Sequence, residues 1–263
     1  MYKSKEEIIN AIESHQWDYE KELVVDGVTQ IKEENLIMRK VKGSNSIYSN
    51  KVVKSVFKNK VENNINYVFN FLGDKPFSWW ISPNSKPFDL KEHLIKRGME
   101  VIDEYIGLAL DLNKWEKLEI ELPYLITEAR NEKDLREHVK VSEEIWGLDE
   151  ESAKVALKQR VQYFNLPSRR GNFIVALDNA SGVGNGSYRY SQDGEVIYLT
   201  GSAVLPKYRK QGIYSSMVAY RLNMAKDKGC RLATVQARKG TSEPILRKMG
   251  FKEYGKYYLM KKE

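Results

Sequence analysis

The stretch from Val204 to Tyr214 most constrains the fold of this 263-residue chain. An apolar segment ends at Pro206, a basic loop follows, and Gly212 precedes an amphipathic segment. This pattern predicts a strand, a turn and a helix in that order. Such a junction points several backbone N–H groups at one place, where the positive end of the helix dipole adds to them, so it suits a diphosphate. Gly212 lets the backbone approach the phosphate oxygens, because a Cβ would stand in between.

The charge distribution favours an anion in the same part of the chain. The whole chain has 43 Lys and Arg against 36 Asp and Glu, but from Thr200 to the end there are 15 basic and 4 acidic side chains. This excess lies around the loop rather than along one long helix or tail, so a compact polyanion explains it as well as a nucleic acid does. For Lys261 and Lys262 we prefer a solvated basic surface.

Composition limits the class of protein. The length allows one large domain or two modest ones, and 41% hydrophobic with 30% charged residues is typical of a soluble globular chain. The single cysteine, Cys230, excludes an internal disulfide and suits a reducing compartment. No signal peptide and no apolar run of the roughly 18 residues needed to span a bilayer is apparent. We therefore expect a cytoplasmic protein that does not enter a membrane.

The two halves of the chain end alike, with a strand, a short helix, a glycine and a last strand. The order is Trp79, Leu94, Gly98 and Leu110 in the first half, and Val235, Leu246, Gly250 and Leu259 in the second. This similarity predicts a duplicated unit with domains at 1–122 and 125–263. The alternative is two unrelated α+β pieces that share a common ending. The glycine-containing anion loop occurs only in the second copy.

Local patterns predict several further elements. A capping box at Ser4–Glu7 begins the first helix, and short strands are expected at Leu23–Val25 and Leu36–Arg39. Gly182–Tyr190 and Glu195–Val204 are expected to form a hairpin across a favoured Asp-Gly turn.

The run Arg209-Lys210-Gln211-Gly212-Ile213-Tyr214 matches Gln/Arg-x-x-Gly-x-Gly/Ala, the acetyl-CoA loop of the GNAT family of N-acetyltransferases. Its context also fits: Val204-x-Pro206 before it, a helix of about Ile213–Lys228 after it, then a strand at Arg231–Ala237 and Leu246–Phe251. From about Leu125 to its end, the chain therefore resembles this family.

The first half, with Phe77-Ser78-Trp79-Trp80, is similar to the degenerate N-terminal repeat of tandem GNAT proteins. The resemblance implies an α+β fold of two GNAT-like domains, each a mixed, mostly antiparallel sheet flanked by helices. It further implies transfer of an acetyl group from acetyl-CoA to a primary amine by direct attack in a ternary complex. It implies no metal or redox cofactor.

The resemblance also implies which residues bind the cofactor. Pantetheine would pair like an added strand with Ser202, Ala203 and Val204, where two strands splay apart, and a backbone N–H on this strand would bind the thioester oxygen. The diphosphate would lie at Lys210 to Ser215. The expected cofactor-binding residues are Ser202, Ala203, Val204, Arg209, Lys210, Gln211, Gly212, Ile213, Tyr214 and Ser215.

Three positions depart from the family pattern. Tyr214 stands where the loop ends in Gly or Ala, and we expect its side chain to point away from the phosphates. Leu246 replaces the tyrosine that many members use as general acid, and Tyr198 replaces the glutamate that many use as general base. Tyr198 is the candidate catalytic residue, as a proton relay; the alternative is a strand tyrosine packed in the core.

Other residue types suggest less. We interpret Cys230 as a small buried residue rather than an acyl-carrying nucleophile. His15, His93 and His138 lack partners at metal-ligand spacing, so no metal site is expected. The run Gly182-Val183-Gly184-Asn185-Gly186 lacks a nucleotide fingerprint and is interpreted as a flexible edge or turn.

Some alternatives stay open at this point. The aromatic residues Trp79 and Trp80 either line the acceptor cleft or fill the domain interface. The acceptor is a small-molecule or peptide amine that the sequence does not specify further. The main alternative to the enzyme is a non-catalytic acyl-CoA-binding or sensing protein, and a weaker one is a nucleic-acid binder that uses the basic C-terminal surface.

Overall fold

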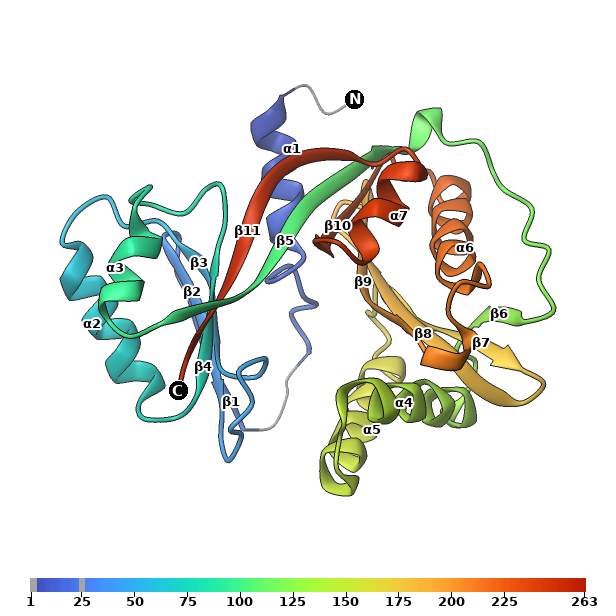
Figure 1. Ribbon diagram of the computed structural model, residues 1–263, viewed down its shortest axis with the longest axis horizontal. Coiled ribbons are helices and arrows are strands. Elements are labelled where there is room, and N and C mark those ends of the chain that lie inside the picture. The colour runs from blue at the N-terminus through green and yellow to red at the C-terminus, as the bar shows by residue number, and fades with distance from the viewer. Residues whose placement is uncertain (1–3, 24–26) are drawn as a thin grey trace.

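The computed structural model describes residues 4–23 and 27–263, and these residues adopt an α+β fold (Figure 1). Within them, seven α-helices accompany one continuous 11-stranded sheet in which most neighbouring strands are antiparallel. The helices are α1 (Lys5–Ser14), α2 (Val61–Leu72), α3 (Leu90–Lys96), α4 (Glu132–Trp146), α5 (Glu150–Phe164), α6 (Ile213–Asp227) and α7 (Ser242–Lys248). The strands are β1 (Val28–Lys32), β2 (Leu36–Val41), β3 (Lys51–Ser55), β4 (Phe77–Ile81), β5 (Glu100–Asp111), β6 (Leu125–Glu128), β7 (Gly171–Asp178), β8 (Ser181–Tyr190), β9 (Val196–Val204), β10 (Leu232–Arg238) and β11 (Lys252–Lys262).

The two halves of the chain exchange their last strands. The strand order is β1-β2-β3-β4-β11-β5-β10-β9-β8-β7-β6, so β11 lies between β4 and β5, and β5 lies between β11 and β10. All three pairings in this central region are antiparallel. Figure 1 shows the long strands β5 and β11 running side by side through the middle of the molecule. Each half of the sheet is therefore completed by the final strand of the other half.

The same order of pairings occurs on both sides of this exchange. The two parallel pairs are β3 with β4 and β9 with β10, and a helix, α2 or α6, connects the members of each pair. The predicted α+β fold class with a mostly antiparallel sheet is confirmed, and the structure adds that the sheets of the two halves are continuous. The domain division at 1–122 and 125–263 stays a prediction, and each range contributes a strand to the sheet of the other.

Three apolar clusters hold the sheet and helices together. One joins α6 to the second half of the sheet, one joins α2 and α3 to the first half, and a smaller one lies under α1. Trp79 is fully buried in the first-half cluster and its Nε1 donates to Ser55 Oγ at 3.0 Å. Trp80 faces the α1 cluster, with its ring centroid 4.9 Å from that of Tyr105. Trp80 therefore packs where residues of the two halves meet, as the structural alternative predicts, whereas Trp79 packs inside the core of the first half.

Most local predictions agree with the structure. The capping box at Ser4 and Glu7 and the β8–β9 hairpin are present, and α6 covers the predicted helix. The strand predicted at Leu36–Arg39 corresponds to β2, while Leu23–Val25 lies largely outside the described residues. Among the helices that the structure describes, none combines the length and the apolarity that a bilayer crossing requires.

The interpretation of residues 182–186 as a flexible edge or turn is wrong. These residues belong to β8, which is paired on both sides, with β7 and with β9. Their glycines make room for close neighbours: a Cβ at Gly182 would lie 2.7 Å from the carbonyl oxygen of Glu137, and one at Gly186 would lie 2.8 Å from Ser202 Oγ. The glycines therefore permit tight packing within an inner strand.

Candidate functional site

The predicted anion loop has the expected strand–turn–helix form. β9 ends at Val204, a short 3₁₀ turn covers Pro206–Tyr208, and α6 begins after Gly212. Gly212 has φ of +82° and Lys210 has φ of +62°, so two left-handed residues bend the chain into the helix. In the described residues no side chain caps α6, and its first turn contains no acidic residue. The first amides of this 15-residue helix therefore remain available to an anion.

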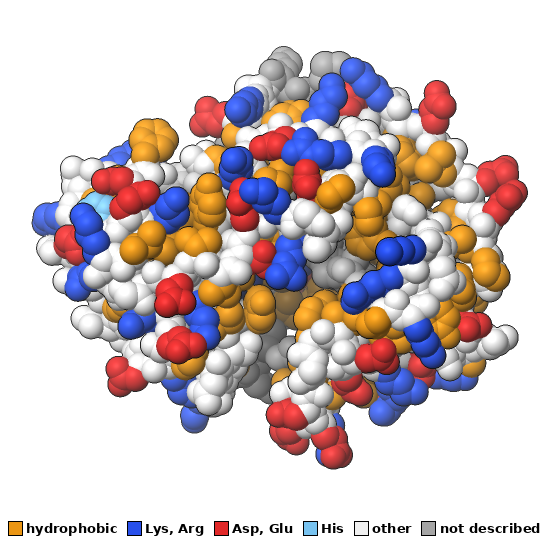
Figure 2. Space-filling view, in the orientation of Figure 1, with side chains coloured by type: hydrophobic (Ala, Val, Ile, Leu, Met, Phe, Trp, Pro, Cys, Tyr) orange, Lys and Arg blue, Asp and Glu red, His pale blue; other side chains and the backbone are white. Residues whose placement is uncertain are grey.

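Side chains around the loop hold its shape. The Gln211 side chain donates from Nε2 to the Lys207 carbonyl oxygen at 3.1 Å and accepts a hydrogen bond from the Tyr124 hydroxyl. Ser215 Oγ donates to the Gly212 carbonyl oxygen at 2.8 Å. Figure 2 shows lysine and arginine side chains on the C-terminal half of the visible face. The loop thus offers an ordered, basic backbone site.

The edge of β9 next to this loop is open. β9 and β10 pair only where Val196–Tyr198 lies beside Leu232–Thr234, and beyond that point the two strands separate. Ala203 and Val204 pair with β8 on their other side, but no described residue of β10 pairs with them. An unpaired strand edge that ends at a helix N-terminus is the geometry that an extended, diphosphate-bearing ligand needs.

The corresponding edge in the first half is closed by the chain itself. After β3, Val56 forms a parallel bridge with Lys86, the Lys86 amide donates to the Ser55 carbonyl oxygen at 3.0 Å, and the Phe57 amide donates to the Lys86 carbonyl oxygen at 2.9 Å. The N-cap of α2 is Lys60, and the turn before it is shorter than the one before α6. Of the two related edges, only that of β9 is free for a ligand.

An arginine that sequence reasoning missed lies beneath the open edge. Arg221, on α6, is fully buried and donates to Ser202 Oγ, to the Ser187 carbonyl oxygen and to the Met217 carbonyl oxygen, each at 2.9 Å. No carboxylate in the described part of the chain forms an ion pair with it. Burial lowers the pKa of the Arg221 guanidinium to about 10, so it remains a cation at neutral pH. The sequence signal for its burial is its place on the helix face that also contains Met217, Val218 and Ala225.

Tyr198 lies on the other face of β9, away from the loop. It is buried, and its hydroxyl donates to Asp18 Oδ2 at 2.9 Å and lies 3.1 Å from Ser14 Oγ. Burial above all, and the adjacent Asp18 carboxylate, raise the pKa of the Tyr198 phenol. The structure does not bring Tyr198 together with the predicted cofactor-binding residues. Because its pKa is raised, the phenol stays protonated at neutral pH and cannot accept a proton as a general base.

The other departures from the family pattern are apolar in the structure. Leu246 is fully buried in the C-terminal core, and Tyr214 packs against the same core as a partly buried side chain. Cys230 is buried too, and burial raises the pKa of its thiol to about 11, which agrees with a structural role. No cluster of three or more potential metal ligands occurs within residues 4–23 and 27–263.

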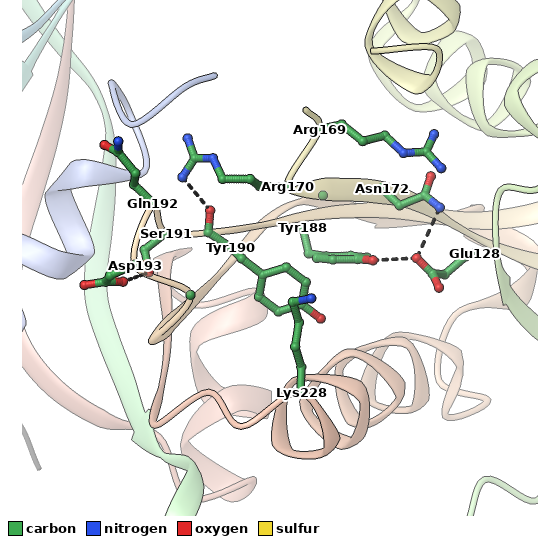
Figure 3. Close-up of a pocket in the computed structure, with 12 residues that line it drawn as sticks. Glu128, Arg169, Arg170, Asn172, Tyr188, Tyr190, Ser191, Gln192, Asp193 and Lys228 are labelled. Carbon is green, nitrogen blue, oxygen red and sulfur yellow. Dashed lines mark hydrogen bonds between the residues drawn. The ribbon is translucent and has the colours of Figure 1, made fainter. Parts of the chain in front are cut away.

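Two cavities lie near the second half of the sheet. The larger, about 430 Å³, lies near the C-terminal end of α6, roughly 22 Å along the helix from the anion loop. In Figure 3 the Tyr188 hydroxyl and the Asn172 amide both reach Glu128, and Lys228 extends toward the Tyr190 ring. The smaller cavity, about 330 Å³, lies between α4, α5 and the sheet, and its wall includes Gly201 of β9.

A family model described as Acetyltransferase (GNAT) family matches residues 133–251. This range includes the open edge of β9, the anion loop and α6. Residues 133–251 belong to the GNAT acetyltransferase family. No curated protein sequence matches the chain.

Solved structures show that the GNAT fold extends over both halves. A GCN5-related N-acetyltransferase from Kribbella flavida is 14% identical with a TM-score of 0.68, covering 97% of this chain and 95% of that one. A tandem GNAT protein from the clavulanic acid biosynthesis pathway is 12% identical with a TM-score of 0.62, covering 97% and 87%. A functionally unknown conserved protein from Staphylococcus epidermidis is 18% identical with a TM-score of 0.68, covering 92% and 96%. At these low sequence identities, the similarity shows a shared fold and nothing further.

Proposed function

We propose that this GNAT protein transfers an acetyl group from acetyl-CoA to a primary amine by direct attack. The observation that carries the proposal is the open edge of β9, which runs into the uncapped N-terminus of α6. The amides from Lys210 to Ser215 would hold the diphosphate, and Ser202 to Val204 would pair with the pantetheine arm. Acetyl-CoA supplies an activated acyl group, and no other cofactor is required.

Positive charge near the acyl position would assist the reaction. Arg221 holds Ser202 through its side chain and has no carboxylate partner in the residues described. Its field would stabilise negative charge that develops on the acyl oxygen beside the β9 amides. The same field lowers the pKa of a nearby alkylammonium group, so the acceptor would lose its proton to water more readily. This route does not require the glutamate and tyrosine that Tyr198 and Leu246 replace.

A non-catalytic acyl-CoA-binding protein is the second candidate. Two observations favour it: Leu246 is fully buried, and the Tyr198 hydroxyl is already engaged by Asp18. Leu246 has no proton to exchange, and the Tyr198 hydroxyl already donates its proton to Asp18. Neither side chain can therefore take the role of the residues that many family members use. Both candidates predict acetyl-CoA binding, but only the transferase predicts release of free CoA that depends on an amine.

The test is a free-CoA release assay with acetyl-CoA across a panel of amines, with Gly212→Asp as the blank. The transferase predicts amine-dependent CoA release by the wild-type protein and none by the blank. Tight acetyl-CoA binding without release for any amine supports the sensing protein. A protein that binds nucleic acid in a salt-sensitive way, without competition from acetyl-CoA, contradicts both.

A further inference from the structure

The smaller cavity is placed to receive the acceptor. Its wall includes Gly201 and Ser187, which lie at the irregular step in the β8–β9 ladder, directly before Ser202 of the open edge. The remaining wall comes from α4, α5 and β7, on the face of the sheet opposite α6. A molecule in this cavity and an acyl group on the edge of β9 would therefore meet at Gly201. At about 330 Å³, the cavity has the size of a small-molecule site.

Among the described residues that line this cavity, Arg160 is the only charged side chain. The guanidinium donates from Nε to His138 Nδ1 at 3.1 Å, from one terminal nitrogen to the Ala156 carbonyl oxygen at 3.1 Å, and from the other to Ser142 Oγ at 3.2 Å. Because an arginine can only donate, His138 Nδ1 is the acceptor, and His138 Nε2 carries the proton that it donates to the Gly186 carbonyl oxygen at 3.0 Å. The imidazole is therefore neutral and fixed in one tautomer.

The positive charge of Arg160 has no ion-pair partner among the residues that the structure describes. No described carboxylate forms an ion pair with it, and on helices α4 and α5 Glu137 pairs with Lys140 and Glu150 pairs with Lys154. All three neighbours of the guanidinium are neutral, and burial lowers its pKa to about 10. Of the five N–H groups of an arginine, these contacts use three, which leaves one on each terminal nitrogen for a ligand.

The rest of the wall is aromatic or neutral. Phe173 lies under the guanidinium, with the Arg160 Cζ atom 5.9 Å from the ring centroid, and Trp146 and Gln159 also line the cavity. No aspartate or glutamate of the described residues lines the cavity, so a polycationic amine would meet like charge and no counter-ion there. A single anionic group beside an apolar or aromatic moiety fits this wall.

We propose that the acceptor carries a carboxylate that Arg160 binds, so that the substrate class is an amino acid or a similar amine-bearing acid. This inference rests on the proposed transferase function, because the cavity is assigned to the acceptor through its position beside the acyl site. The carboxylate would take the two remaining N–H groups of Arg160 as a paired contact. The amine would then face Gly201 and the open edge.

Two measurements on matched acceptors test the proposal. Free-CoA release is measured with aromatic and aliphatic amino acids, with their carboxamides and with their decarboxylated amines. Binding of the same compounds is measured by calorimetry in the presence of CoA. The variants are Arg160→Gln and Arg160→Lys, with Lys154→Ala on the same helix as control. Acetyl-CoA affinity and thermal melting confirm that each variant is folded.

We expect the wild-type protein to prefer amino acids to their amides by about tenfold to a hundredfold, which is the usual worth of a charge-assisted contact. Arg160→Gln should remove this preference by lowering turnover of the acids to the level of the amides, Arg160→Lys should keep part of it, and Lys154→Ala should leave it intact.

The two proposals fail in different ways. Equal turnover of amides and acids that Arg160→Gln does not alter overturns the carboxylate site and leaves the transferase in place. Binding of amino acids that depends on Arg160, without CoA release from any amine, supports the site and overturns the transferase. Failure of every amino acid to bind overturns the site.

Discussion

The Tyr198 hydroxyl donates a hydrogen bond to Asp18 Oδ2 at 2.9 Å and thereby joins β9 to the segment that follows α1. Asp18 also accepts from the Arg170 guanidinium at 3.0 Å, so the contact belongs to a small polar network between the two halves. Burial and the Asp18 carboxylate raise the pKa of Tyr198. The position that holds the general base in many GNAT enzymes therefore has a structural hydrogen bond in this protein.

Tyr198→Phe should change stability rather than the protonation step. We expect the free energy of unfolding to fall by about 1–2 kcal/mol, because a buried hydrogen bond to a carboxylate is lost. The pH–rate profile for CoA release should keep its shape, since the phenol stays protonated throughout the neutral range. Urea unfolding and a pH–rate series check the two parts. Loss of one limb of the profile in the variant would restore Tyr198 as a proton relay.

Gly212→Asp should abolish acetyl-CoA binding while the protein remains folded. A Cβ at this position meets only Leu122, at 3.5 Å, so the change costs about 1–2 kcal/mol for a left-handed residue with a side chain. The new carboxylate would repel the diphosphate, and we expect calorimetric affinity to fall by about a hundredfold or more. Gly194→Asp is the matched control, because Gly194 has φ of +75° and open space around it but lies in the β8–β9 turn. Unchanged affinity in Gly212→Asp would place the diphosphate elsewhere.

The cofactor loop could be predicted from sequence because its signals are local. Pro206 and Gly212 set the turn and the helix start, and the hydrophobic pattern of α6 follows at once. By contrast, β3 was missed because lysines interrupt its short apolar run, and the glycines of β8 suggested flexibility although neighbouring atoms require them. Elements with strong nearest-neighbour signals are predictable from a single sequence, and those defined by packing are not.

The strand exchange and the two arginines are non-local features. Periodicity identifies β5 and β11 as strands but does not show that Tyr105 pairs with Tyr257, far along the chain. An arginine on a helix is usually solvated, so nothing in the sequence marks Arg160 and Arg221 as lacking carboxylate partners. Which groups surround each guanidinium is known only from the folded structure, because those groups come from distant parts of the chain.

Glu13 should make the protein less stable as the pH rises. Burial raises the pKa of Glu13 to about 7, although Ser82 and Asn84 lower it somewhat, and Oε1 has no hydrogen-bond partner in the described structure. Between pH 4.5 and 7 the unfolded chain has released this proton while the folded protein still holds it. The free energy of unfolding should therefore fall by up to about 3 kcal/mol across that window.

Glu13→Gln removes the proton exchange and tests this assignment. We expect the variant to lose that part of the pH dependence and to be more stable than the wild type at pH 8. Urea unfolding at several pH values between 4 and 8 provides the measurement, with Glu6→Gln, an exposed position on the same helix, as control. If wild type and Glu13→Gln show the same slope, another group titrates in this window.

The strand exchange predicts that neither half folds alone. Fragment 125–263 lacks β5, which pairs with β10 from Leu232 to Arg238 and also with β11, so the centre of its sheet would be missing. Fragment 1–122 lacks β11 and leaves an edge of β4 unpaired. We expect each fragment to lack cooperative unfolding, and the mixture to recover it together with acetyl-CoA binding. A full chain cut at a protease site inserted between Leu122 and Pro123 should stay associated, because its strands are already exchanged. An isolated fragment 125–263 that melts cooperatively and binds acetyl-CoA would show that the exchanged strands are dispensable.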